Sequence, residues 1–278
     1  MNLVPYDAVQ LPKEEEDKAM AVINESEHSR KISLETLRNM LKDKEFKPSL
    51  DKEFLLAYLR AYEFDCDRTA HCMQTYYELV RDNPDYYKTC VLDALPKAYL
   101  NPFEISPFRM KDNSLLLIAQ YFKIDVAELP LTEKVYLDAV SHFYLMQNPI
   151  NQICGFTVIS DVVDLMLSKL PQYANYNWIR LGARAVLNSP CRVKKIHVVN
   201  ASEGFLSAYK ALSPLMPKKM VDMLQFHSDS TEFKDLHEFV PPEILPEKYG
   251  GHLKECELIN GMKNILQMED YYRKYFPL

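Results

Sequence analysis

Four short apolar runs in the middle and later parts of the chain most constrain its fold. Each run is rich in strand-forming residues and is bounded by polar or turn residues. The runs lie at 115–118, 156–159, 196–199 and 223–226. Helix-length stretches at about 132–147 and 162–188 separate them, the second interrupted near Pro171. Because buried strands that alternate with helices pair in parallel, this order predicts an α/β fold, with a mostly parallel sheet and flanking helices.

The first 95 residues carry helical patterns instead. Helices are expected to begin near Lys13 and near Ser33, and a third helix should begin with Ser49 or Asp51 as its N-cap. A fourth helix should run from about 67 to 81. This block predicts a small all-α domain that precedes the sheet.

These patterns divide the chain into three parts. We expect the all-α domain over 1–95, the α/β domain over 96–252 and a C-terminal helical tail over 253–278. The first 30 residues hold seven acids and three bases, and the first 25 or so are the part for which flexibility is expected.

One uncharged stretch, 139–160, is long enough to cross a bilayer. Its middle holds Asn148, Pro149, Asn151 and Gln152, so it is better interpreted as a helix, a turn and a buried strand. The N-terminus lacks the positive start and apolar core of a signal peptide. We therefore expect a cytoplasmic protein that visits membrane surfaces transiently and does not cross them.

Charge, cysteine and glycine content argue against several other classes of protein. The formal net charge is −6, which argues against nucleic acid as a partner. The six cysteines lack C-x-x-C spacing and the seven histidines are dispersed, so neither a disulfide framework nor a metal site is expected. The six glycines build no phosphate-binding loop.

A few residues stand where catalytic groups often lie. Asp161 and Asp164 follow the second apolar run, but a helix N-cap explains these carboxylates better than catalysis does. His197 falls inside the third run and is interpreted as a packed or hydrogen-bonded strand histidine. We therefore expect that the protein is not an enzyme.

The segment 189–227 combines a strand run, a helix-length apolar stripe and a cluster of positive charge. Six basic residues and two acids lie in it. One interpretation is a strand followed by a core helix with solvated lysines. The other is a movable apolar helix beside a cationic patch, which suits docking on anionic membrane.

Three stretches of the chain resemble signature segments of one family. They are FLLAYLRAYEFD at 54–65, SPCRVKKIHVVN at 189–200 and LPEKYGG at 245–251, and GFTVISD at 155–161 adds a weaker match. In order and spacing these stretches resemble the CRAL-TRIO lipid-binding family, in particular the branch of the α-tocopherol transfer and retinaldehyde-binding proteins. The resemblance covers about residues 50 to 252.

The resemblance implies a helical N-terminal domain followed by an α/β domain that holds one hydrophobic ligand under a helical gate. The gate falls on about 200–223, where Pro214 and Pro217 must interrupt the helix and supply a hinge. The implied function is a cytosolic, monomeric carrier of one small hydrophobic lipid, such as a tocopherol, retinoid or carotenoid, with no other cofactor. The alternative is an adaptor in membrane trafficking that binds phosphoinositides.

Alternation along the runs and the resemblance together predict the ligand pocket. Its walls are expected from Leu117, Ala119, His142, Val158, Ser160, Leu181, Ala185, Ile196, Val198, Phe205, Tyr209 and Leu212. Of these, His142 would either contact the polar end of a ligand or be a satisfied interior histidine. Ser160 stands where the transfer protein has a bulky aromatic residue, which implies a reshaped cavity.

The resemblance also places an anionic-lipid site at the edge of the gate. Its candidate residues are Arg192, Lys194, Lys195, Lys218 and Lys219. Tyr62 and Met223 stand where the transfer protein has arginines, and this departure weakens the expectation of a specific bisphosphate site. General attraction to anionic lipid, about 1 kcal/mol per basic side chain near the surface, is still expected.

Overall fold

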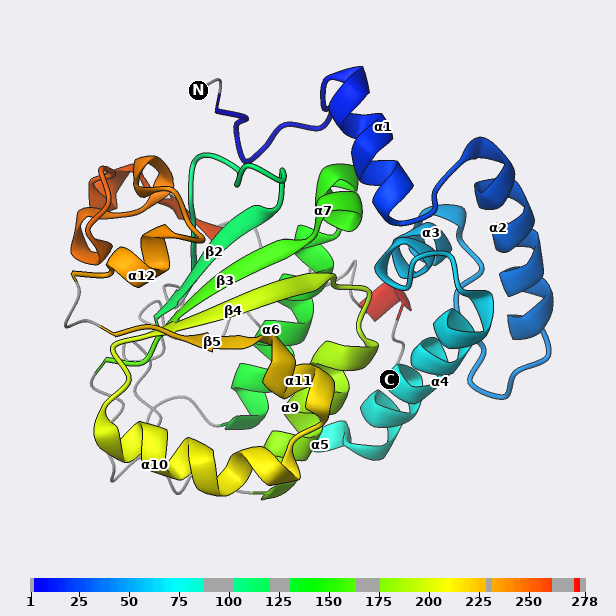
Figure 1. Cartoon of the computed structure of the whole chain (residues 1–278). Helices are drawn as coiled ribbons and strands as arrows, with labels where there is room; N and C mark the ends of the chain where they lie inside the picture. The colour runs from blue at the N-terminus through cyan, green and yellow to red at the C-terminus, as the bar shows by residue number, and fades with distance from the viewer. Residues whose placement is uncertain are drawn as a thin grey trace.

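The computed structural model of the chain describes residues 3–87, 103–120, 131–163, 176–228, 232–261 and 273–275. Figure 1 shows a twisted sheet in the centre, a group of helices from the N-terminal part on one side of it, and a compact C-terminal segment around α12 at the other end.

The N-terminal part is helical, as predicted. Its helices are α1 (Lys13–Val22), α2 (Glu27–Leu41), α3 (Lys52–Ala61), α4 (Cys66–Asp82) and α5 (Pro84–Tyr87). Asp51 caps α3 by accepting a hydrogen bond from the Glu53 amide at 3.0 Å, so the predicted N-cap is confirmed. The predicted start of α2 is wrong by about six residues, because Ser26 caps the helix earlier through the Ser29 amide.

Within the described ranges the sheet has six strands, in the order β5-β4-β3-β2-β1-β6. Strands β2, β3, β4 and β5 are parallel, whereas β1 runs antiparallel to both β2 and β6. The strands are β1 (Phe103–Ile105), β2 (Leu115–Gln120), β3 (Phe156–Asp161), β4 (Val193–Val199), β5 (Leu224–Phe226) and β6 (Ile259–Asn260). The α/β class and the four parallel strands are therefore confirmed, and β1 and β6 were not predicted.

Different parts of the chain cover the two faces of the sheet. On one face, Ile118 and Ile159 belong to a fully buried cluster with Leu236, Val240 and Tyr249 of the C-terminal segment. On the other face, the core continues into α6 (Leu131–Leu145), α7 (Pro149–Cys154) and α9 (Tyr176–Asn188), as Figure 1 shows. The uncharged stretch 139–160 runs through α6, α7 and β3, which confirms its interpretation as helix, turn and strand. No helix in the described ranges is long and apolar enough to cross a bilayer.

The predicted gate region forms two short helices joined by a turn. They are α10 (Glu203–Leu212) and α11 (Lys218–Met223), with the 3-10 turn η4 (Ser213–Leu215) between them. Pro214 lies inside the turn and Pro217 directly precedes α11, so the predicted interruption by the two prolines is confirmed. In Figure 1 α10 lies along the rim of the molecule, beyond β5.

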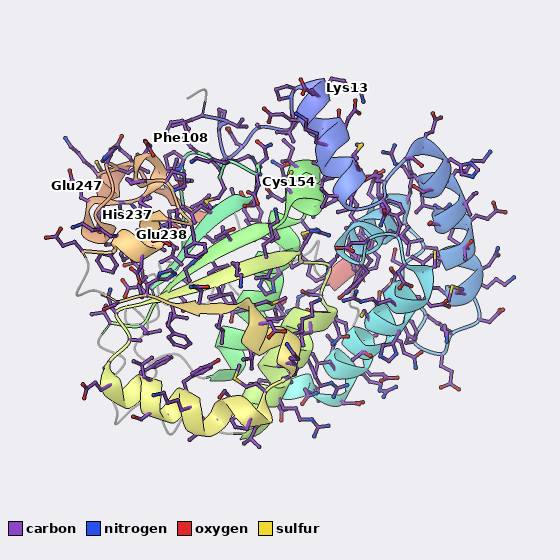
Figure 2. The ribbon with its side chains drawn as sticks, in the orientation of Figure 1. Lys13, Phe108, Cys154, His237, Glu238 and Glu247 are labelled. Atoms are coloured by element: carbon purple, nitrogen blue, oxygen red, sulfur yellow. The ribbon has the colours of Figure 1, made fainter. Side chains whose placement is uncertain are left out.

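The C-terminal segment is built mainly from short turns. It contains α12 (Lys234–His237) and the 3-10 turns η6 (Pro242–Ile244), η7 (Glu247–Tyr249) and η8 (Glu255–Glu257). Figure 2 shows His237 and Glu247 in this segment, on the same side of the molecule as Phe108. An added Cβ at Gly251 would lie 2.1 Å from the Leu245 carbonyl oxygen, which explains why the LPEKYGG stretch ends in glycine.

The first residues of the chain are tied to the α/β part by hydrogen bonds. The Arg109 amide donates to the Val4 carbonyl at 2.8 Å, and the Tyr6 amide donates to the Pro107 carbonyl at 2.9 Å. The Arg109 guanidinium also donates to the Tyr6 carbonyl at 2.6 Å. The acidic composition of this segment suggested flexibility, but these bonds fasten it beside β2.

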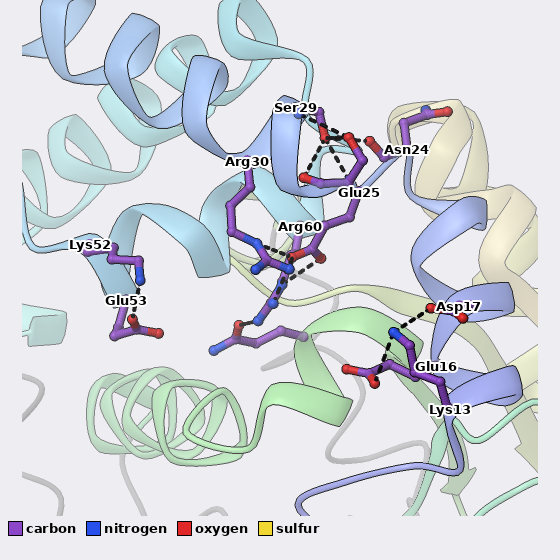
Figure 3. A network of polar contacts seen from close by, with 12 residues as sticks. Lys13, Glu16, Asp17, Asn24, Glu25, Ser29, Arg30, Lys52, Glu53 and Arg60 are labelled. Carbon is purple, nitrogen blue, oxygen red and sulfur yellow. Dashed lines mark hydrogen bonds and ion pairs between the residues drawn. The ribbon is translucent and has the colours of Figure 1, made fainter.

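A buried ion pair joins the N-terminal helices to α7. Figure 3 shows Glu25 between Arg30 and Arg60, and the Glu25 side chain is 0% exposed. Arg60 donates to both carboxylate oxygens of Glu25, at 2.8 and 2.9 Å, and to Gln152 of α7 at 2.6 Å. Burial raises the pKa of Glu25, but the hydrogen bonds and charges of Arg60 and Arg30 outweigh that effect and hold the pKa below its usual value.

Candidate functional site

The predicted sheet residues of the pocket share one face. In the register of the sheet, Leu117, Val158 and Ile196 form one row across β2, β3 and β4. Ala119, Ser160 and Val198 form the next row on the same face. His197 lies on the opposite face, where it is 2% exposed and hydrogen-bonded to His227, so its interpretation as a packed strand histidine is confirmed.

Helix α10 approaches this face through aromatic rings. The Tyr209 ring lies 4.7 Å from the Phe226 ring of β5, and the Phe205 ring lies 6.4 Å from it. Nevertheless, none of the α10 residues is fully buried, and Leu212 is half-buried. Ile118 and Ile159, on the far face of the sheet, are both 0% exposed, whereas Val158 and Ile196 are only half-buried.

This contrast indicates what the face can do. Val158, Ile196 and apolar side chains of α10 remain half-buried, whereas Leu117 and Val198 on the same sheet face are each 4% exposed. An apolar molecule against the half-buried side chains would complete their burial. Ser160 adds a hydroxyl within this face, in the row next to Val158. The arrangement therefore suits a ligand that is apolar over most of its length and carries a small polar group.

The three pocket residues predicted on α6 and α9 do not belong to the sheet face. Leu181 is in the core cluster shared by the N-terminal helices and α6, and Ala185 packs against that cluster. His142 is half-buried on α6, and its carbonyl oxygen accepts a hydrogen bond from the Cys191 thiol at 3.7 Å. Contact of these three residues with a ligand stays a prediction.

A basic cleft lies beside this face, where the α3–α4 turn meets the start of β4 and α11. Its volume is about 170 Å³. Arg68, Arg192, Lys194 and Lys219 line it, and Glu63 is the acid among its lining residues. The other lining residues are Ala61, Tyr62, Val186, Leu187, Cys191, Val193 and Met223.

Two of the four cations are paired with acids. Arg192 donates to a Glu63 carboxylate oxygen at 3.0 Å, and Lys194 donates to Asp112 at 2.5 Å. Among the described residues, no carboxylate forms an ion pair with Arg68 or Lys219. The cleft therefore keeps a surplus of positive charge that an anionic group would balance.

Burial and nearby positive charge both act on the pKa of Lys219, which lies on α11. Burial lowers the pKa of Lys219, and the nearby positive charge of Arg68 lowers it further. The Arg68 guanidinium lies 5.4 Å from the centre of the Tyr62 ring, a cation–π distance. The Tyr62 hydroxyl donates to the carbonyl oxygens of Leu187 and Ser189, and Tyr62 lines the cleft.

The structure brings together only part of the predicted cationic set. Arg192, Lys194 and Lys219 line the cleft, whereas Lys195 and Lys218 do not. Lys218 is 86% exposed and pairs with Asp222 at 2.6 Å, and Lys195 donates to the Asp222 carbonyl at 3.0 Å. Sequence reasoning missed Arg68, since one arginine on a polar helix carries no signal until the fold places α4 beside α11.

Asp161, the candidate carboxylate, has structural partners. It accepts hydrogen bonds from the Val163 amide at 3.1 Å, the Asn200 side chain at 2.8 Å and the Tyr249 hydroxyl at 2.7 Å. Asp164 and the helix that Asp161 was predicted to cap lie outside the described residues, so the capping role stays a prediction. Within the described ranges no three metal-binding side chains gather into a candidate metal site.

Comparisons with known proteins give a consistent result. The CRAL/TRIO domain family matches residues 109–251. The human α-tocopherol transfer protein-like protein is 25% identical over 263 residues, which are 93% of this chain and 76% of that protein. Mouse clavesin-2 is 23% identical, over 91% of this chain and 78% of its own length. The SEC14 cytosolic factor of Eremothecium gossypii is 25% identical, over 85% of this chain and 80% of its own length.

Proposed function

Because this chain belongs to the CRAL/TRIO domain family of lipid-binding proteins, we propose that it is a carrier of one small hydrophobic lipid, such as a tocopherol, retinoid or carotenoid. The observation that carries the proposal is the half-buried apolar face formed by Val158, Ile196 and α10. The name of the human relative refers to α-tocopherol transfer and supports this class of ligand.

Affinity would come mainly from apolar burial. At about 25 cal/mol per Å² of apolar surface, a ligand that buries roughly 400 Å² would gain about 10 kcal/mol before the costs of ordering. The Ser160 hydroxyl, which is 8% exposed, and the half-buried His142 are the candidates to orient the polar end.

Transfer would use the gate. α10 touches β5 through Phe226 and is joined to α11 by the proline-containing turn at 213–217, so opening would separate Tyr209 from Phe226 and bend the chain at this turn. Opening at an anionic membrane surface would lower the barrier to ligand exit, and the basic cleft next to α11 would hold the protein there. We place the carrier in the cytoplasm, transiently bound to membrane surfaces, and we propose no enzymatic activity.

Native mass spectrometry of the protein isolated from its own tissue tests the carrier proposal. A mass increment of one non-phosphorylated lipid per chain is expected. Protein that is empty after gentle isolation, and that takes up no tocopherol, retinoid or carotenoid from mixed vesicles, would falsify it.

A second candidate function rests on a separate observation, the positive charge of Arg68 and Lys219 in the cleft, for which the described part of the chain supplies no ion-pairing carboxylate. A phosphoinositide headgroup would balance that charge, and the protein would then act as an adaptor in membrane trafficking. Binding to phosphoinositide vesicles without any bound hydrophobic lipid favours the adaptor. Protein that carries a bound hydrophobic lipid and binds phosphoinositide vesicles and other anionic vesicles with equal affinity favours the carrier.

A further inference from the structure

Two histidines form a buried pair behind the gate. His197 Nδ1 lies 2.8 Å from His227 Nε2, and the two side chains belong to residues that are 2% and 6% exposed. The Phe239 ring lies 5.4 Å from the His197 ring and 5.8 Å from the His227 ring. One hydrogen bond therefore joins two neutral rings in an environment that excludes most water.

The charged groups that face the pair lie on α12 and on β4. Asp235 Oδ2 is 3.4 Å from His227 Nδ1 and also accepts from the Ser228 amide at 3.0 Å. Glu238 lies at the end of α12 beside the sheet in Figure 2. Its negative charge raises the pKa of His227, as the charge of Asp235 does. The positive charge of Lys195 on β4 lowers the pKa of His197.

The pair is connected to the gate through one strand. His227 directly follows β5, and its amide donates to the Val198 carbonyl at 2.9 Å. Phe226, one residue earlier, carries the ring that touches Tyr209 of α10. Loss of order at His227 would therefore loosen the strand end on which the gate rests.

In the neutral pair, one proton lies between His197 Nδ1 and His227 Nε2. A further proton on His227 Nδ1 keeps this hydrogen bond, because the Asp235 carboxylate faces that nitrogen. When both rings are protonated, two N–H groups point at each other and the hydrogen bond is lost. Burial lowers the pKa of His197 to about 4, with the nearby His227 and Lys195 acting in the same direction. Burial also lowers the pKa of His227, against the opposing effects of Asp235 and Glu238.

The sign of the pH effect follows from these shifts. A histidine released to water has a pKa of about 6.5, so the open form binds protons that the closed form does not. The closed form is favoured above about pH 6.5 and loses relative stability as the pH falls toward about 4. From pH 7 to pH 5, one such histidine shifts the equilibrium toward the open form by at most about 20-fold.

We propose that the His197–His227 pair is an acid-sensitive latch that frees β5 and the gate helices when the protein meets an acidic membrane surface. The latch itself is a property of the protein without ligand. Only its consequence, faster lipid exit at acidic surfaces, rests on the carrier function proposed above.

Hydrogen–deuterium exchange of the full chain without added lipid tests the latch. Exchange would be measured at pH 7.0 and pH 5.0 and corrected for the intrinsic effect of pH. We expect the corrected protection of peptides within 203–228 to fall about 5- to 20-fold, while peptides of α3 change less than twofold. The substitution His227→Gln keeps a polar side chain that does not titrate and leaves His197 as the one titrating ring of the pair, so this difference should become clearly smaller.

His28→Gln is the matched control, because His28 is exposed on α2. It should leave the pH response of 203–228 unchanged. Equal corrected protection of 203–228 in the parent protein at both pH values overturns the latch, as does an unchanged response in His227→Gln. If that variant does not fold, the histidine ring signals of the parent in NMR decide: two rings that do not titrate above about pH 5.5 support the latch, and titration of all rings near pH 6.5 overturns it.

Discussion

The Tyr249 hydroxyl donates a hydrogen bond of 2.7 Å to the Asp161 carboxylate inside the protein. The other oxygen of the same carboxylate accepts from the Asn200 side chain at 2.8 Å. Asp161 ends β3, Asn200 follows β4, and Tyr249 lies in the LPEKYGG stretch, so three of the four stretches that resemble the family meet at one carboxylate. The motif residues at these positions tie the C-terminal segment to the ends of the strands.

This relationship predicts that Tyr249→Phe destabilises the fold. The variant leaves a buried carboxylate oxygen without one of its donors, which should lower the free energy of unfolding by about 1–3 kcal/mol in urea titrations. Tyr58→Phe is the matched control, because the buried Tyr58 hydroxyl has no hydrogen-bond partner among the residues that the structure describes. Removing that hydroxyl should cost little or stabilise slightly, and equal losses in the two variants would count against the role given to Tyr249.

The buried Glu25–Arg60 pair gives a second prediction. Arg60→Met leaves the Glu25 carboxylate buried with only Arg30 beside it, so the free energy of unfolding should fall by about 3–5 kcal/mol. Lys18→Met breaks an exposed pair with Glu14 and should cost no more than about 1 kcal/mol. A loss below 1 kcal/mol in Arg60→Met would contradict a stabilising role for the buried Glu25–Arg60 pair.

The same pair should contribute to acid sensitivity. The pKa of Glu25 is held below its usual value, so the unfolded chain binds a proton before the folded protein does. The stabilisation is present above about pH 4.5 and is lost as the pH falls through the folded pKa. Urea titrations at pH 7 and pH 3.5 should show a smaller loss on acidification in Glu25→Gln than in the parent, and identical losses would contradict the assignment.

Much of the fold was predictable because it depends on local patterns. The runs that became β2, β3, β4 and β5 are apolar and bounded by polar residues, which is a strong signal for buried parallel strands. β1 and β6 have three and two residues, too few for any periodicity to appear, and they pair only because the fold brings distant segments together.

Site residues were predictable from the sequence only on the strands, where the alternation of side chains between the two sheet faces decides which residues lie together. The shared face of Val158, Ser160, Ile196 and Val198 follows from a period of two. Arg68, Glu25 and His227 had no such signal, since each is a single polar residue whose role depends on a partner far away in sequence. Lys195 and Lys218 looked equivalent to Lys194 and Lys219 in the sequence, but neighbouring residues on a strand or a helix point in different directions, and only Lys194 and Lys219 line the cleft.

The cleft gives a prediction about membrane docking. Arg68→Gln combined with Lys219→Gln removes the two cations of the cleft that form no ion pair with a carboxylate of the described ranges, and should weaken binding to vesicles of anionic lipid by roughly 30-fold at low salt, about 1 kcal/mol per cation. Lys218→Gln, next to Lys219 but paired with Asp222 outside the cleft, should have a smaller effect. Equal binding of the double variant and the parent in a low-salt sedimentation assay would remove the docking role, because screening is weakest there.

We expect the contact between the Tyr209 and Phe226 rings to slow the exit of a ligand. Phe226→Ala removes the ring against which α10 rests, and aromatic pairs of this kind contribute about 0.5–1.5 kcal/mol beyond their burial. If that contact holds the gate closed, spontaneous release of a fluorescent tocopherol analogue should become about 2- to 10-fold faster. Leu215→Ala changes a gate residue that is 54% exposed and should leave spontaneous release unchanged. Unchanged release from Phe226→Ala, with the fold intact by circular dichroism, would show that the gate is held elsewhere.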